Sequence, residues 1–140
     1  MADALLPLQT ALVNHLTAGS PTLFAYSLYT GRAPQKAGFP YAVIGFDSAV
    51  DWGTKTEPGQ EITATFHCWT RGSGNTSLAL TTKQVMEMMA ALYAALHEAE
   101  FSVSGQDLVS CRFDFGQVIE EPDGQTFHGV ARYRLHLSAA

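Results

Sequence analysis

The sequence predicts an α+β domain in which two helices pack on one face of a four-stranded, mainly antiparallel sheet. Two segments carry apolar residues at helical spacing, and four others alternate apolar and polar residues as strands do. The predicted order is helix, strand, strand, helix, strand, strand. Because each strand has one apolar face, a single sheet with both helices on one side buries all four. We therefore expect residues 1–140 to form one domain.

The first predicted element is a helix over residues 3–18. Leucines recur there at helical spacing and would form one apolar stripe: Leu5, Leu8, Leu12 and Leu16. A weak apolar stretch, LFAYSLY, comes next and is not counted among the strands. Alternating segments then predict two strands, over residues 41–50 and 61–70, that pair antiparallel. The loop between them contains Trp52 and is long for a hairpin, so we expect it to project from the sheet.

The second predicted helix is the strongest in the sequence, and two more strands follow it. The helix has one apolar stripe: Val85, Met88, Met89, Leu92 and Leu96. The last two strands are predicted over residues 109–119 and 126–137. A Pro-Asp-Gly turn joins them, since proline fixes φ and glycine tolerates positive φ. They are expected to form an antiparallel hairpin.

The segment RGSGN, residues 71–75, resembles a phosphate-binding loop because two glycines and an arginine precede a helix. It lacks the spacing and the lysine of such a loop. The preferred interpretation is a flexible connection in which Asn75, Thr76 or Ser77 serves as the helix N-cap.

The outward face of the predicted sheet is polar. We expect it to carry Thr63, Thr65, His67, Trp69, Arg112, Asp114, His128, Arg132, Arg134 and His136. Its histidines and aspartate could supply an acid and a base, so a small α+β enzyme or ligand-binding protein that uses this face is the alternative hypothesis. The sequence has neither a GxSxG motif nor a compact set of metal ligands. We therefore predict no catalytic residue, no cofactor and no metal.

Composition argues against two other classes of protein. The chain has 8 Lys and Arg against 13 Asp and Glu, a formal net charge of -5, whereas nucleic-acid binders neutralise many phosphates with cations. No apolar run is long enough to cross a membrane. Cys68 and Cys111 lie far apart within alternating strands, so we expect reduced, buried thiols on the helix-facing side of the sheet.

Residues 31–40, here called the arm, contain two prolines, two glycines and two cations. Ala33 and Phe39 each precede a proline and are therefore biased to extended conformations, and the prolines donate no backbone hydrogen bond. The cations Arg32 and Lys36 are isolated from other basic residues. The arm is therefore predicted to be a semi-rigid contact element.

Three stretches, "YTGRAPQKAGFPYAVIGF", "HCWTRGSG" and "PDGQTFHGVARYRLHL", carry a resemblance to a known family. They resemble the tail-completion, or tail-terminator, family of long-tailed bacteriophages and of phage-derived gene-transfer particles. The similarity runs from about Leu5 to Leu137. Its motifs map onto Gly31, Arg32, Pro34 and Gln35, onto Pro40 and Tyr41, onto Trp69 and Arg71, and onto Tyr133 and Arg134.

The resemblance implies a structural subunit that assembles into a homo-hexameric ring on the end of the tail tube. Such a ring stops tube polymerisation, contacts the tail tube protein and the head–tail connector protein, and lets DNA pass through its lumen. It implies a place in the virion tail after assembly in the host bacterial cytoplasm, without a membrane. With the arm and the polar face, it predicts these subunit or partner contacts: Arg32, Pro34, Gln35, Phe39, Trp52, Trp69, Arg71, Arg132 and Arg134.

Overall fold

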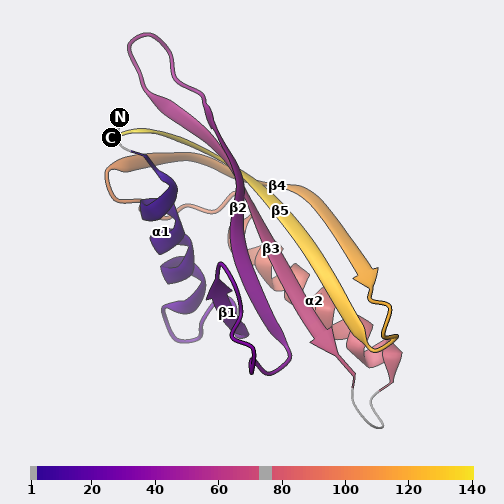
Figure 1. Cartoon of the computed structure of the whole chain (residues 1–140). Coiled ribbons are helices and arrows are strands. Elements are labelled where there is room, and N and C mark those ends of the chain that lie inside the picture. The colour runs from indigo at the N-terminus through magenta and orange to yellow at the C-terminus, as the bar shows by residue number, and fades with distance from the viewer. Residues whose placement is uncertain (1–2, 73–76) are drawn as a thin grey trace.

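The computed structural model describes residues 3–72 and 77–140 and shows a twisted sheet with two helices (Figure 1). The elements in chain order are α1 (Leu5–Thr17), β1 (Ser27–Thr30), β2 (Tyr41–Asp51), β3 (Gly59–Arg71), α2 (Leu78–Leu96), β4 (Gln106–Glu120) and β5 (Thr126–Ala139). The strands form one sheet in the order β1-β2-β3-β5-β4. The α+β class and the two helices are confirmed.

The prediction of four strands is wrong, because the sheet has a fifth strand, β1. It begins in the weak stretch LFAYSLY, extends one residue beyond it, and pairs parallel with β2, from Ser27 opposite Tyr41 to Thr30 opposite Ile44. The sheet is therefore mixed, and the order is helix, three strands, helix, two strands. A strand of four residues is too short for a clear alternating pattern, so its ladder with β2 defines it more than its own sequence does.

The two predicted antiparallel hairpins are confirmed. β2 pairs antiparallel with β3, and β4 pairs antiparallel with β5. The β4–β5 turn places Gly124 at a φ of 71°, which glycine adopts without steric cost. The β2–β3 connection extends beyond the rest of the molecule (Figure 1). At the centre of the sheet, β3 pairs with β5 from Gly59 opposite Ser138 to Arg71 opposite Thr126.

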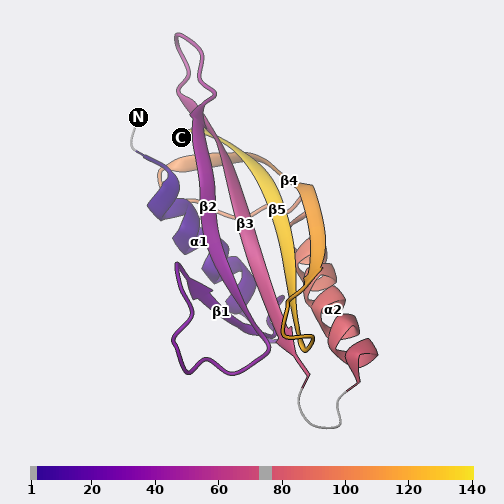
Figure 2. The same cartoon turned by 45° about the vertical axis from the view of Figure 1, so that its right-hand side comes forward.

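Both helices lie on the same side of the sheet, behind it in Figure 2. The leucine stripe of α1 and the Val–Met–Leu stripe of α2 belong to one buried cluster with the inward side chains of the strands. His15 Nε2 donates to the carbonyl oxygen of Ala95 at 2.8 Å and links the two helices. Ser77 is the N-cap of α2, accepting from the Leu80 amide at 3.2 Å, whereas Asn75 and Thr76 lie outside the described residues.

Helix α2 approaches β5 closely at Gly129. A Cβ at Gly129 would lie 2.8 Å from Met89 Sδ and 2.9 Å from Val85 Cγ2. The glycine therefore permits the close contact between helix and strand.

Both cysteines are free and buried on the helix-facing side of the sheet, as predicted. Cys68 lies beside Phe66 on the buried face of β3, and Cys111 lies opposite Leu135 of β5. Burial raises the pKa of each thiol to about 12, so the reactive thiolate is scarce near neutral pH.

Native protein treated with a thiol-reactive reagent at pH 7.5 should therefore label Cys68 and Cys111 far more slowly than the same chain in denaturant. Reaction should require local or global opening of the sheet. The measurement is the labelling rate of each cysteine, resolved by peptide mass spectrometry. Rapid labelling of both in the native state would mean that the strand faces are assigned the wrong way round.

Candidate subunit interface

The sheet face opposite the helices, here called the outer face, carries the polar residues expected from strand alternation. Thr65 also lies on this face, but it is buried, with only 3% of the residue exposed. Its hydroxyl donates to a carboxylate oxygen of Asp47 on β2, which satisfies the buried group.

Two arginines predicted to contact partners are paired within the chain on this face. Arg132 Nε lies 3.5 Å from Asp47 Oδ2. Arg134 lies 3.6 Å from Glu61 through Nε and 3.4 Å from Asp114 through Nη2. Side chains of β2, β3, β5 and β4 are thus joined across the strands, and opposite charges in such positions stabilise the sheet. Neither arginine is a free cation for a partner.

A histidine pair at one end of the outer face was missed by the sequence analysis. His67 Nδ1 and His128 Nε2 share a hydrogen bond of 2.7 Å, and His128 stacks on Trp69 with ring centroids 3.9 Å apart. Burial, and then the nearby His67, lowers the pKa of His128 from 6.5 to about 4. His128 is therefore neutral at pH 7, and its 3.6 Å approach to Glu121 is not an ion pair there.

A second row at the other end of the face joins Ser110, His136 and Glu61. The Ser110 hydroxyl lies 3.0 Å from His136 Nδ1, and His136 Nε2 donates to Glu61 at 2.9 Å. The order serine, histidine, acid is that of a hydrolytic triad. The three residues come from β4, β5 and β3, so only the strand order reveals the row. Glu61 also contacts Arg134, which ties the row into the cross-strand charge pairs.

β1 forms one edge of the sheet. The arm leaves β1 and returns along this edge to the start of β2 (Figures 1 and 2). Arg32, Pro34 and Gln35 are exposed, whereas Phe39 is half-buried. The Phe39 ring packs on Tyr41 at 5.2 Å and lies 4.6 Å below the Arg71 guanidinium. This contact fixes the end of the arm and leaves its middle open to a partner.

The predicted contact residues therefore form three groups. Phe39, Trp69 and Arg71 line one shallow hollow of about 340 Å³, and Arg32 and Trp69 line a neighbouring hollow of about 400 Å³ that includes both paired histidines. Arg132 and Arg134 lie midway along the face. Trp52 lies at the far end, where its ring packs at a tilt against His136 with ring centroids 4.5 Å apart.

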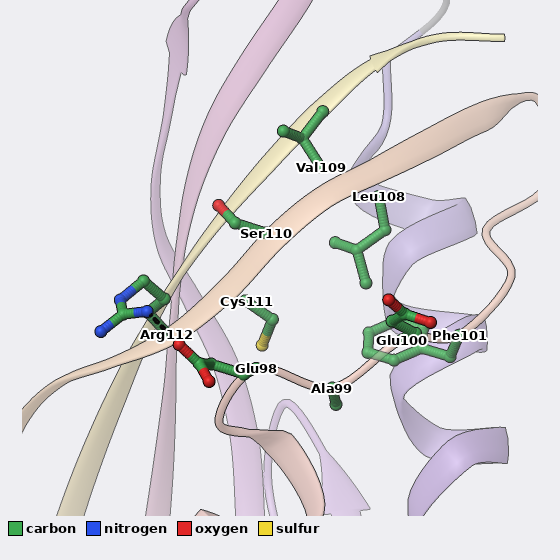
Figure 3. A pocket seen from close by; sticks show the side chains of 9 residues that line it. All are labelled: Glu98, Ala99, Glu100, Phe101, Leu108, Val109, Ser110, Cys111 and Arg112. Carbon is green, nitrogen blue, oxygen red and sulfur yellow. Dashed lines mark hydrogen bonds and ion pairs between the residues drawn. The ribbon is translucent and has the colours of Figure 1, made fainter.

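A further hollow, of about 450 Å³, lies between β4 and the chain segment that connects α2 to β4 (Figure 3). The ion pair of Arg112 with Glu98 lies at its rim, and none of the predicted contact residues lines it. Within residues 3–72 and 77–140 there is no cluster of three or more side chains suited to a metal ion. No helix of the same described part is long and apolar enough to cross a membrane.

Polar groups that are paired with one another, beside an open and semi-rigid arm, fit a structural assembly subunit better than an enzyme. The family model described as tail completion protein gp17 matches residues 10–138 of the chain, and the chain belongs to that family. The tail completion protein gp17 of Bacillus phage SPP1 is 28% identical over 131 residues, which cover 94% of this chain and 92% of that protein.

A solved structure shares the fold. A chain from the virion of a native gene transfer agent (GTA) particle is similar with a TM-score of 0.79 and 20% identity, covering 99% of this chain and 100% of that chain. The family resemblance inferred from the sequence is thereby confirmed. The chain is a structural protein of the virion tail and not an enzyme, which decides against the alternative hypothesis for the outer face.

The histidine pair predicts a pH dependence of stability. The unfolded chain binds a proton at His128 below about pH 6.5, and the folded chain binds it only near pH 4. The free energy of unfolding should therefore fall by about 1–3 kcal/mol as the pH is lowered from 7 to 4. His128→Phe keeps a ring on Trp69 but cannot titrate, so it should show a shallower fall. Denaturant unfolding at several pH values measures this, and equal slopes for both proteins would contradict it.

Proposed function

We propose that the chain forms a hexameric ring that caps the end of the tail tube, terminates tube polymerisation and provides the joint to the head connector. Family membership supports a tail role, and the ring is the assembly that the tail-terminator resemblance implies. The partners are further copies of the chain, the tail tube protein and the connector protein, while DNA passes through the lumen. A net charge of -5 suits a lumen that repels the DNA backbone.

The observation that carries this proposal is the exposed arm. Its cations Arg32 and Lys36 form no ion pair with any residue that the structure describes. The arm is anchored at one end by Phe39, and two prolines restrict its backbone. A restricted segment loses less conformational entropy when it is fixed against a partner. Arg32, Pro34, Gln35 and Phe39 would then contribute to association.

The predicted contact residues outside the arm would have different roles in the assembly. Trp69 and Arg71 adjoin Phe39 and would extend the arm contact onto the outer face. Trp52, on the projecting β2–β3 connection, would meet the tube or the connector. Arg132 and Arg134 would position side chains of the outer face through their pairs with Asp47, Glu61 and Asp114.

Pro34→Gly should weaken ring formation while leaving the subunit folded. With glycine in place of one proline, the free arm is more flexible and loses more conformational entropy on binding, which costs about 0.4–1 kcal/mol. This cost corresponds to roughly two- to fivefold weaker association at each contact. Light scattering and negative-stain microscopy at graded protein concentrations measure the effect. In cells that produce particles, the variant should give tails of uncontrolled length or tails without heads.

Pro7→Gly is the matched control, because Pro7 lies in the first turn of α1 and away from the arm. It should leave ring formation unchanged. If Pro34→Gly also leaves rings and particles unchanged, the arm is only a connection between β1 and β2. If the wild-type chain never forms rings, the proposed function itself fails.

A further inference from the structure

We infer that the distal half of β4, residues 114–120, is the surface that receives the arm of the neighbouring copy. This inference rests on the proposed ring and names the two surfaces that meet in it. The contact is head-to-tail: the arm edge of each sheet lies against the β4 edge of the next.

The distal half of β4 is exposed on both sides, although each side carries large apolar side chains. Every residue from Arg112 to Glu120 is exposed. The large apolar side chains of the distal half, Phe115, Val118 and Ile119, and the adjacent Phe113 are 36–40% exposed. Phe113 points to the helix side, where it packs on Tyr93, while Phe115 lies under Arg132 on the outer face. A long apolar edge strand attracts other chains unless something covers it.

The proximal half of β4 is already covered by its own chain. The segment after α2 runs along it (Figure 3), where the Glu98 amide donates to the Cys111 carbonyl at 2.7 Å and the Phe113 amide donates to His97 Nδ1 at 3.0 Å. No other described strand pairs with β4 beyond its ladder with β5. The free part of the edge therefore begins after Phe113.

The two surfaces have opposite charge. The arm carries Arg32 and Lys36 and contains no acidic residue, whereas residues 114–120 contain Asp114 and Glu120 and no Lys or Arg. Asp114 is already paired with Arg134. Glu120 forms no ion pair with any described residue. The unpaired cations of the arm and the unpaired Glu120 thus complement each other, and such pairs fix the register of an interface and accelerate association.

The two surfaces also lie at the same level of the sheet, on opposite edges. Tyr41, directly after the arm, is opposite Trp69, which is opposite His128, which is opposite Ile119. Figure 2 shows the arm at the β1 edge and the end of β4 at the other edge. Two different complementary patches on one chain make a heterologous contact, which forms a ring when the rotation closes. A second copy is therefore the occupant that the structure favours.

Cross-linking tests this contact directly. The double variant Lys36→Cys, Glu120→Cys is assembled and treated with a short bis-maleimide, to which the buried Cys68 and Cys111 react slowly. A head-to-tail contact should give a covalent ladder of multimers up to the full ring on a denaturing gel. Lys36→Cys alone or Glu120→Cys alone should give no ladder. Lys55→Cys with Glu120→Cys is the matched control, since Lys55 is a cation on the β2–β3 connection at the opposite end of the strands.

Charge reversal is the second measurement. Lys36→Glu should raise the concentration for half-assembly about tenfold at low salt, and Glu120→Lys in the same chain should restore it. Rings that form normally but give no ladder with Lys36→Cys, Glu120→Cys would overturn the inference while leaving the ring intact. An equal ladder with the Lys55→Cys control, or cross-links only to the tube protein, would also overturn it. Absence of rings in the unmodified chain would identify failure of the proposed function.

Discussion

The packing of both helices on one face of the sheet is the constraint on which the rest of the structure depends. The inward stripes of α1 and α2 and the inward side chains of β2, β3 and β5 share one core, so the inner face of these three strands needs no partner. The outer face is left to solvent or to neighbours. It is stabilised by pairs such as Arg132 with Asp47 and by stacked rings such as His128 on Trp69.

These internal pairs change the expected role of the outer face. Arg134 contacts both Glu61 and Asp114. If Arg134 turned away to bind a partner, these two half-exposed carboxylates would lose their cation. Exposed pairs of this kind contribute little each but fix side-chain positions when they form a network. Arg32 and Lys36 of the arm and Glu120 of the distal half of β4, in contrast, form no ion pair with any residue that the structure describes, and they lie at the two edges of the sheet. In the proposed ring, assembly through the edges would leave the outer face ordered and free for the tube, the connector or the lumen.

Strong local patterns were sufficient for most of the fold and insufficient for the site. The helical stripes predicted α1 and α2, and the alternating residues predicted β2 to β5 and the buried side of Cys68. Each of these patterns can be recognised from residues that are close together in the sequence. β1 was missed because its four residues depend on a ladder with β2. The His67–His128 pair and the Ser110–His136–Glu61 row require the β3–β5–β4 strand order. One face of the strand predicted over residues 109–119 was expected to be buried, whereas residues 112–120 are exposed. Whether an edge strand is covered depends on the rest of the fold and cannot be recognised from consecutive residues.

In the proposed ring, each copy is completed at one edge by the arm of the next. Electron cryo-microscopy of rings assembled from the unmodified chain tests it most directly. We expect six copies related by rotation, with residues 31–40 of each lying against residues 114–120 of its neighbour and with Lys36 near Glu120. Rings in which both of these segments remain exposed to solvent, or in which two copies meet through identical patches, would contradict it.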